Sequence, residues 1–355
     1  MPRAVHAECL LYACVAFVLA TGLACSKTEP PSSPASSERS QPSSVPVAPV
    51  LAASAPVAPA PSAPPTIEDT SFRFPAAERI VAIGDIHGDV HAARAALQLG
   101  GAIDAAGKWI GGGLVVVQTG DQLDRGDDEP QILDLFERLR GEAKLAGGAL
   151  YALNGNHEII NAQGDFRYVT EDGFHDFSDR HADARLAPLL EQLPAERRGR
   201  AAAFLPGGDI ARRLSQQPVV IEVGDTVFVH GGVLEAHVRY GLARINREAR
   251  EWLSGPPTVP APRVLTDPEA PIWTRDYSDG TPTPDKCAEL ERVLSALSAK
   301  RLVVGHTVQK QGINSACTDK VWRIDVGLSR FYGAKPSVLE IKGEQVRVLA
   351  AHEAQ

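Results

Sequence analysis

The chain has 355 residues, 44% of them hydrophobic and 23% charged, which is typical of a globular protein with one large domain or two ordinary ones. Its formal net charge of −8 excludes a surface that attracts nucleic acid as a whole. An electropositive site inside this acidic protein is still compatible with the composition, because bound metal ions set the local field.

Residues 1–25 have the pattern of an export signal. Arg3 supplies a positive charge, and Leu10–Leu23 is almost entirely apolar but too short and wrongly flanked for a spanning helix. The run ends at Gly22-Leu23-Ala24-Cys25-Ser26, which resembles a bacterial lipoprotein cleavage site with Cys25 acylated, although the Leu lies two places before the Cys instead of three. An ordinary cleaved signal peptide with an incidental Cys25 is the alternative.

The next segment, residues 26–70, is dominated by Pro, Ser, Ala and Val. It has no periodic apolar face, and its prolines are too frequent for a helix or a sheet. We expect a disordered, semi-extended tether. A tether behind an acylated Cys25 predicts an exported protein, either periplasmic or anchored to the membrane by its lipid.

From residue 71 to residue 355 the pattern predicts one domain of alternating strands, loops and helices. Glu129–Ala146 is expected to be a helix, because its apolar residues recur at helical spacing on one face. Short apolar runs are typical of buried strands. They are Ile80–Ile83, Leu114–Thr119, Ala149–Leu153, Thr226–His230 and Arg301–Gly305.

Two later segments differ from this alternation. Residues 160–217 are rich in Arg, Asp and aromatic residues, and we expect a mostly helical insertion that could cap a site. Val338–Ile341 and Gln345–Leu349 predict a closing hairpin with Gly343 in its turn.

Polar residues of metal-ligand type follow each of the predicted strands. In open α/β sheets, ligands bind outside the carboxyl ends of the strands, so these residues are expected to converge. One such motif alone carries little information, whereas all of them in this order are a specific signal. They are Gly84-Asp85-Ile86-His87-Gly88-Asp89, Gly120-Asp121-Gln122-Leu123-Asp124-Arg125-Gly126, Gly155-Asn156-His157-Glu158, His230-Gly231-Gly232 and Gly305-His306-Thr307.

The spacing of these residues fits a two-metal site. Asp85 and His87 are two apart, so an extended backbone points both the same way. A carboxylate together with an imidazole suits Mn, Fe or Zn better than Ca or Mg. Asp121 can bridge two ions, since a carboxylate has two oxygens. The side chains left for the second ion are Asn156, His230 and His306.

These motifs resemble the calcineurin-like metallophosphoesterase superfamily and, within it, the phosphoprotein phosphatases. Asp121–Gly126 and Gly155–Glu158 match the Gly-Asp-x-x-Asp-Arg-Gly and Gly-Asn-His-Glu blocks of that family. The similarity spans about residues 75–340. Three further blocks are similar to the Shewanella-like phosphatases: Leu153–Glu158, Ile272–Arg275 and Val304–Gln309.

Two departures separate the chain from the eukaryotic members. Those enzymes have Leu-Arg before Gly-Asn-His-Glu, where this chain has Leu153-Asn154, and their C-terminal toxin-docking motif is absent here. The protein substrates of the eukaryotic enzymes therefore do not carry over.

The resemblance implies an α/β fold, a calcineurin-like β-sandwich flanked by helices, with two divalent metal ions of the Mn, Fe or Zn type. It implies that Asp85, His87 and Asp121 hold the first ion. The implied ligands of the second ion are Asp121, Asn156, His230 and His306.

The resemblance also implies roles in the reaction. His157 is the implied general acid and Asp124 orients it, since a His beside a carboxylate stays protonated to higher pH. Arg125, Arg275 and Asn156 are the implied contacts to the phosphate, and guanidinium forks suit phosphate oxygens. A plain surface charge is the alternative for Arg275.

Together these features predict hydrolysis of phosphate monoesters by a hydroxide activated between two metals. The expected substrate is a protein or peptide phosphorylated on Ser, Thr or Tyr. A diadenosine-tetraphosphate hydrolase or a nucleotide phosphatase with the same site is the enzymatic alternative. A tethered binding protein that has lost catalysis is the alternative of another class, and the complete set of ligands, acid and Arg residues argues against it.

Residues outside the motifs support smaller predictions. Cys287 and Cys317 are the cysteines of the main body, and in an exported protein we expect them to pair, with two buried free thiols as the alternative. The histidines off the motifs are expected at the surface. They are His91, His175, His181 and His237.

Overall fold

The computed structural model describes residues 72–181 and 186–351. These residues fall within one compact unit, Ala63–Gln355. The expected signal at 1–25, the tether at 26–70 and the lipid site Cys25 lie outside the described residues. Among the helices that are described, none has both the length and the apolar character that crossing a bilayer would need.

The strands are β1 (Arg73–Phe74), β2 (Ile80–Ile83), β3 (Val115–Gln118), β4 (Ala149–Ala152), β5 (Val220–Val223), β6 (Thr226–Val229), β7 (Arg301–Val304), β8 (Asn314–Ala316), β9 (Val321–Arg323), β10 (Ser337–Lys342) and β11 (Gln345–Ala350). The helices are α1 (Val90–Leu99), α2 (Glu129–Leu145), α3 (Asn156–Ala162), α4 (Glu171–His175), α5 (Ala187–Leu190), α6 (Ala195–Phe204), α7 (Asp209–Leu214), α8 (Glu235–Tyr240), α9 (Leu242–Ser254), α10 (Arg263–Thr266) and α11 (Pro284–Leu297).

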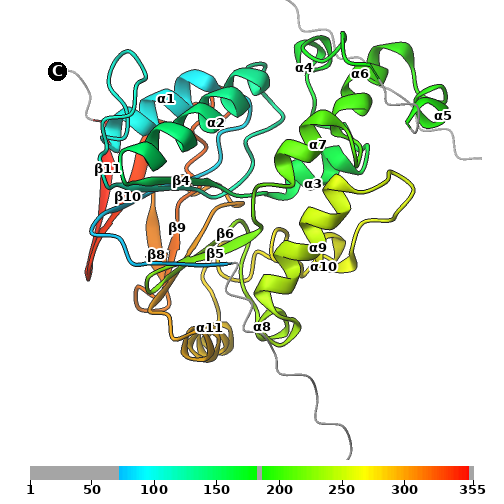
Figure 1. The fold of residues 1–355 in the computed structure, drawn as a ribbon. Coiled ribbons are helices and arrows are strands. Elements are labelled where there is room, and N and C mark those ends of the chain that lie inside the picture. The colour runs from blue at the N-terminus through cyan, green and yellow to red at the C-terminus, as the bar shows by residue number, and fades with distance from the viewer. Residues whose placement is uncertain (1–71, 182–185, 352–355) are drawn as a thin grey trace, which may run out of the picture. The chain divides into compact units, whose positions relative to one another are not determined.

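The strands form two facing sheets, as expected for an α/β sandwich. One has six strands in the order β1-β5-β6-β7-β9-β8, and the other has five in the order β11-β10-β2-β3-β4. In the first sheet β6, β7 and β9 are parallel, and in the second β2, β3 and β4 are parallel. Figure 1 shows α1 and α2 over the five-stranded sheet and α8 and α11 on the opposite side, beyond the six-stranded one.

Alternation along the strands buries both faces of the six-stranded sheet. Phe228 packs in the same apolar cluster as Ile83 and other residues of the five-stranded sheet. Its neighbours Val227 and Val229 pack in a second cluster with residues of the helices on the other side, such as Leu294. Successive side chains of a strand point to opposite faces, so this division follows from the pleat.

The five predicted strands form where the apolar runs indicate. The bounds of β2 are those predicted, and the other four end one residue before the predicted end. The residue after the strand still bonds to the neighbouring strand end in three of these four cases, through the N–H groups of Thr119, Leu153 and Gly305. The hairpin of β10 and β11 also forms, with Gly343 at a positive φ of 56° in its turn.

The helix α2 begins at Glu129, where Pro130 stands in the first turn and lacks an N–H that the helix could not use there anyway. Its buried face contains Ile132, Leu135 and Leu139 at helical spacing. The described part of residues 160–217 contains the end of α3 and the helices α4 to α7, with α6 packed against α3, α4, α5 and α7.

One expectation about the surface histidines is wrong. His237 is buried, and its Nδ1 accepts a hydrogen bond of 3.0 Å from the backbone N–H of Leu234 at the start of α8. Burial lowers the pKa of His237 to about 4, so the imidazole is neutral and able to accept this bond. His91, His175 and His181 are exposed, as expected.

The structure joins Cys287 of α11 and Cys317, which follows β8, in a disulfide with a sequence separation of 30 residues. The pairing expected from the sequence is therefore present in the fold. Cys317 and the next two residues, Thr318 and Asp319, all have positive φ angles, so the bond fastens a tight turn to the helix.

Reduction of this disulfide should lower thermal stability. A loop of about 30 residues gives a chain-entropy contribution of roughly 3–4 kcal/mol, which corresponds to a fall in Tm on the order of 5–10 °C. Thermal unfolding with and without a reductant measures it. The double variant Cys287→Ser, Cys317→Ser is the control, and its Tm should not respond to the reductant. Two free thiols in the purified protein, counted under denaturing, non-reducing conditions, would contradict the prediction.

Candidate active site

The loops that follow the strands hold several motif residues in left-handed backbone conformations. Such angles are uncommon for residues with side chains, cost roughly 1–3 kcal/mol each, and persist where the surrounding structure enforces them. They turn the chain sharply at the strand ends, so that side chains from separate loops meet. The φ angles are 48° at His87, 56° at Asp121, 67° at Asp124, 67° at Arg125 and 67° at His306.

Two motif glycines permit a close approach of the loops. A Cβ at Gly155 would lie 2.3 Å from Asp121 Oδ1, and a Cβ at Gly305 would lie 2.3 Å from Asp85 Oδ1. No side chain fits at such distances, so both positions require glycine. The carboxylates therefore pack directly against the backbone of neighbouring strand ends.

Asp121 lies at the centre of the site and is buried. Its Oδ2 is 3.2 Å from His230 Nε2, 3.7 Å from His157 Nε2 and 3.8 Å from His87 Nε2. Burial alone would raise the pKa of Asp121, but His230 and His157 outweigh it and hold the pKa well below the usual range. The carboxylate is thus an anion that faces several imidazoles.

Three imidazoles each use one ring nitrogen on a backbone carbonyl and turn the other toward the centre. In metal sites such a contact fixes the tautomer and leaves the second nitrogen free to bind the ion. The pairs, each 3.0 Å apart, are His87 Nδ1 with Leu123 O, His230 Nδ1 with Thr119 O, and His306 Nε2 with Trp273 O.

The protonation states of this cluster suit a cation. Burial is the main cause that lowers the pKa of His87 to about 3 and that of His306 to about 2, so both imidazoles are neutral, as ligation requires. Burial, Asp325 and Asp121 together raise the pKa of Asp85 well above its usual value. Crowded carboxylates of this kind are relieved by a positive ion between them.

The structure brings together all of the metal ligands expected from the sequence. Asn156 Oδ1 is 2.9 Å from His230 Nε2, and His306 Nδ1 is 3.1 Å from the same atom. Both oxygens of Asp85 accept from the N–H of His306. Within the described residues, two groups have donor atoms within 4.8 Å of one another: His87, Asp121 and His157, and Asp121, His230 and His306. Asp121 belongs to both groups, and oxygen with imidazole nitrogen is a donor set that divalent transition metals accept.

His157 lies beside this cluster and pairs with Asp124. Its Nδ1 is 2.5 Å from Asp124 Oδ2, while its Nε2 faces the centre. Burial would lower the pKa of His157, but Asp121 and the hydrogen bond to Asp124 outweigh it, and the pKa is raised above its ordinary value. The site therefore contains one imidazole suited to carry a proton among others suited to bind a cation.

Both predicted arginines lie at the edge of the site. Arg125 NH1 is 2.9 Å from His87 Nε2 and also contacts Tyr332 Oη. Arg275 NH1 donates to His306 O and to Thr307 Oγ1, both at 2.7 Å. Two guanidinium groups beside a cluster of side chains suited to hold metal ions favour the binding of a doubly charged oxyanion such as phosphate.

An aromatic rim, formed by Tyr168, Phe331 and Tyr332, surrounds Arg125. The guanidinium carbon of Arg125 lies 5.2, 5.8 and 5.3 Å from the centres of these three rings, in that order. The Tyr168 ring is 5.0 Å from that of His157, and the Tyr332 ring is 5.6 Å from that of His87. The rim was not predicted, because single aromatic residues in loops carry no sequence signal.

Two buried carboxylates near the centre were also missed. Glu158 accepts from the N–H groups of Asp121, Gln122 and Gly155 at 2.9, 2.8 and 2.6 Å, and so holds two motif loops together. Burial, with the charge of Asp121, raises the pKa of Glu158 to about 7. Asp325 follows β9 and is one of the causes that raise the pKa of Asp85, after burial.

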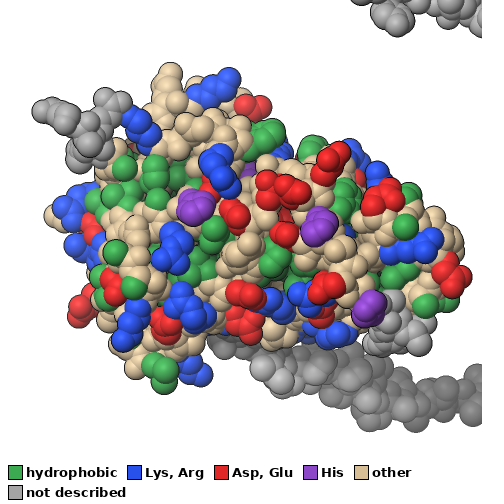
Figure 2. Space-filling view, turned by 90° about the horizontal axis from the view of Figure 1, so that it is seen from above, with side chains coloured by type: hydrophobic (Ala, Val, Ile, Leu, Met, Phe, Trp, Pro, Cys, Tyr) green, Lys and Arg blue, Asp and Glu red, His purple; other side chains and the backbone are tan. Residues whose placement is uncertain are grey.

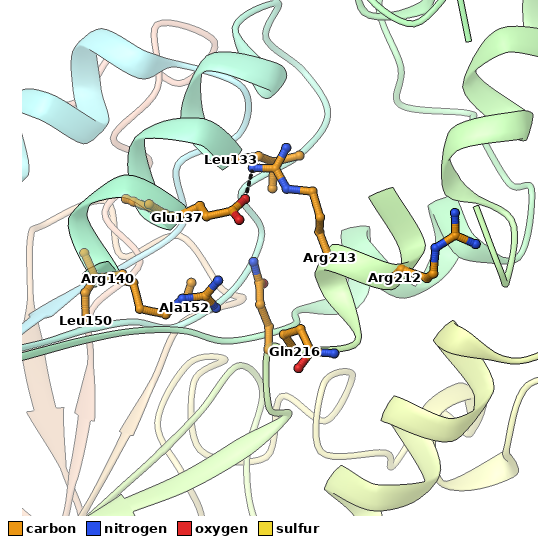
Figure 3. A pocket seen from close by; sticks show the side chains of 10 residues that line it. Leu133, Glu137, Arg140, Leu150, Ala152, Arg212, Arg213 and Gln216 are labelled. Atoms are coloured by element: carbon orange, nitrogen blue, oxygen red, sulfur yellow. Dashed lines mark ion pairs between the residues drawn. The ribbon is translucent and has the colours of Figure 1, made fainter. Parts of the chain in front are cut away.

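A surface pocket lies elsewhere, between α2, β4 and α7. Figure 3 shows its side chains, with Arg213 paired to Glu137 at 2.8 Å. Its volume is about 200 Å³, and its lining within the described residues contains none of the motif residues. Figure 2 shows acidic and basic side chains interspersed over one face of the protein, without a patch of a single sign.

Known proteins are similar to this chain in sequence and in fold. The model of the calcineurin-like phosphoesterase family matches residues 78–310. Shewanella-like protein phosphatase 2 of Arabidopsis thaliana is 41% identical over an alignment of 311 residues that covers 79% of this chain and 79% of that one. Shewanella-like protein phosphatase 1 of Plasmodium berghei (strain Anka) is 29% identical over 280 residues, covering 76% of this chain and 74% of that one.

Among solved structures, the cold-active protein-tyrosine phosphatase of a psychrophilic Shewanella species has a TM-score of 0.62 and 25% identity, covering 78% of this chain and 82% of that one. The resemblance expected from the motifs is therefore confirmed. The buried carboxylate of Asp121 and the neutral imidazoles that face it fit the two divalent metal ions that this family uses. The match to the family model and the relative that is 41% identical show that the chain belongs to the calcineurin-like phosphoesterase family and is a metal-dependent phosphatase.

Proposed function

We propose that this phosphatase removes phosphate from phosphorylated proteins or peptides. The observation that carries the proposal is the convergence of an acid pair, His157 with Asp124, and of Arg125 on the cluster around Asp121. The relatives that support a protein substrate are named protein phosphatases.

The proposed ligands of the first ion are Asp85, His87 and Asp121, and those of the second are Asp121, Asn156, His230 and His306. When bound, the ions supply Lewis-acid chemistry, since they lower the pKa of water and offset the charge of the phosphoryl group. The buried ring contacts of His87, His230 and His306 to backbone carbonyls support this assignment, because they turn the other ring nitrogens toward the centre of the site.

The proposed task of His157 is to protonate the leaving oxygen of the substrate. Asp124, 2.5 Å from its Nδ1, orients the ring so that Nε2 faces the reacting group. Arg125 and Arg275 bind phosphate oxygens, and Asn156 adds a further contact. Within the described residues, Arg275 keeps its place through His306 O and Thr307 Oγ1.

We further propose a preference for phosphotyrosine over phosphoserine and phosphothreonine. The three rings of the aromatic rim are 42%, 63% and 37% exposed at Tyr168, Phe331 and Tyr332, so they offer faces to an aryl leaving group. The Shewanella structure named above is that of a protein-tyrosine phosphatase.

The test is kcat/KM for peptides of one sequence that carry phosphotyrosine or phosphoserine, with Mn²⁺ supplied. Tyr168→Leu should reduce the ratio between the two roughly 2–10-fold, the value of one aromatic contact. Tyr240→Leu is the matched control, because Tyr240 is 37% exposed on α8 and away from the rim. A ratio unchanged by Tyr168→Leu would count against the phosphotyrosine preference.

The same assay separates the rival functions. Faster turnover of diadenosine tetraphosphate or nucleotides than of phosphopeptides would favour a nucleotide phosphatase. Metal-loaded protein that hydrolyses neither these compounds nor p-nitrophenyl phosphate would favour a binding protein.

We also propose that the protein is exported and anchored by a lipid at Cys25. The apolar run before Cys25 and the pairing of Cys287 with Cys317 support it, since disulfides persist in oxidising compartments. The wild-type protein should fractionate with membranes, and Cys25→Ser should move it to the soluble fraction. Failure to label the wild type with a fatty-acid analogue would leave a freely soluble exported enzyme.

A further inference from the structure

Arg200, in the inserted helix α6, lies next to the acid pair although it belongs to none of the motifs. It is fully buried, with a relative exposure of 0%. Its NH2 is 3.3 Å from Asp124 Oδ1, the oxygen opposite to the one that pairs with His157. The guanidinium of Arg200 and the ring of His157 thus contact different oxygens of the Asp124 carboxylate.

Every nitrogen of this guanidinium has a partner. Two of them bind both oxygens of Glu129, at 2.5 and 2.9 Å, and Nε donates to Asn161 Oδ1 at 2.9 Å. NH1 also donates to Gly173 O at 2.9 Å. A planar fork with all its donors engaged is held in one orientation, which a flexible ammonium group would not be.

The partners of Arg200 also hold Asp124 directly. Glu129 Oε1 accepts from the backbone N–H of Asp124 at 2.6 Å, and Asn161 Nδ2 donates to Asp124 Oδ1 at 3.0 Å. Arg200, Glu129 and Asn161 therefore fix both the backbone and the carboxylate of Asp124, which takes a left-handed φ of 67°.

Aromatic side chains surround the guanidinium of Arg200. The guanidinium carbon of Arg200 lies 4.5, 5.4 and 6.0 Å from the ring centres of Phe204, Phe177 and Phe166. A buried cation among aromatic rings needs paired anions. Asp124 and Glu129 supply the two carboxyl groups that Arg200 faces.

We propose that Arg200 is a positioning residue for the acid pair: it fixes Asp124 so that the carboxylate holds the His157 ring in the orientation that protonates the leaving group. The inference rests on the proposed role of His157. The proposal gives the 160–217 insertion a role in the reaction through the buried side chain of Arg200.

The experiment is a double-mutant cycle between Arg200→Lys and His157→Ala in the full metal-loaded protein. Arg200→Lys keeps the charge but cannot make the fork, and should lower kcat for a phosphoserine peptide roughly 10–100-fold. The loss should be much smaller for p-nitrophenyl phosphate, whose leaving group needs little protonation. In the His157→Ala background, Arg200→Lys should add almost no further loss, because the acid it positions is absent.

Two further measurements exclude a merely structural effect. Metal content and KM should stay close to wild type in Arg200→Lys, and added guanidinium should restore part of the activity of Arg200→Ala. Arg198→Lys is the matched control on the same helix, since Arg198 is exposed and, among the described residues, donates to backbone oxygens of Leu193 and Glu191. It should leave kcat unchanged.

Losses that are equal for both substrates, or that add fully to those of His157→Ala, would overturn the role of Arg200. If Arg200→Lys fails to fold, Glu129→Gln tests the same clamp, with the same substrate pattern expected and the same results against it. If His157→Ala itself shows no dependence on the leaving group, the proposed acid is wrong and the failure lies there, not in Arg200.

Discussion

Replacing Asp121 with Asn is expected to lower kcat by on the order of 10³-fold or more, because it removes the central carboxylate of the proposed metal site. Asp121 Oδ2 is the atom around which His230, His157 and His87 gather, at 3.2 to 3.8 Å. An amide keeps the shape but has no negative charge and only one oxygen, so it cannot be shared by two ions. The site would lose both metal affinity and the charge that organises its imidazoles.

The measurements are steady-state kinetics with phosphopeptide and metal analysis of the purified variant. Asp121 Oδ1 also accepts from the backbone N–H of His157 at 3.0 Å, a bond that the Asn oxygen can keep, so the fold should survive. Asp134→Asn is the control, because Asp134 is an exposed carboxylate paired with Arg213. A variant with full metal content and near-normal kcat would refute the bridging role of Asp121.

The position of the metal cluster could be predicted because its residues follow strands. Apolar runs of strand length mark the sheet, and the first polar residues after them must lie at its carboxyl edge. Asp85, Asp121 and His306 come from three such strand ends, and the structure brings them together as expected. Each motif could be recognised from its own residues, and the topology of the sheets brings the motifs together.

Asp325 escaped prediction although it follows a strand as well. The strand β9 has only three residues and includes Arg323, so no apolar run announced it. It becomes a strand because it pairs in parallel with β7, which is a tertiary contact. Such a short strand forms because it pairs with a neighbouring strand, and its own β-propensity is too weak to predict it from the sequence.

The clamp behind Asp124 could not be predicted for a different reason. Arg200 is 76 residues from Asp124 in sequence, and α6 is one of several short helices with mixed charge. The sequence alone does not distinguish the buried Arg200 from an exposed Arg such as Arg198, two residues before it. The contacts of Arg200 with Glu129 and Asn161 are tertiary contacts, which the sequence alone does not indicate.

The left-handed turns were likewise hidden. Glycines in the motifs indicated sharp turns, but the strain at His87, Asp121 and His306 falls on residues with side chains. Those angles are imposed by the loops packing on one another, so the cost is met by the whole domain.

Replacing His157 with Ala is the second large change, and kcat should fall roughly 10²–10⁴-fold, the usual value of general acid catalysis. The prediction follows from its pairing with Asp124 at 2.5 Å and from the direction of its Nε2 toward the centre. Because a proton is needed most by a poor leaving group, the loss should be largest for phosphoserine peptides and smallest for p-nitrophenyl phosphate.

Metal content decides between this role and ligation. His157 has a donor atom within 4.8 Å of those of His87 and Asp121, so the geometry alone would also suit a third imidazole ligand. As an acid, His157 can be removed with little loss of metal, whereas removal of a ligand such as His230 should empty the site. His91→Ala is the control for an exposed His on α1, and its kinetics should match wild type. Equal losses for both substrates, together with a loss of metal, would make His157 a ligand and would require another group to protonate the leaving oxygen.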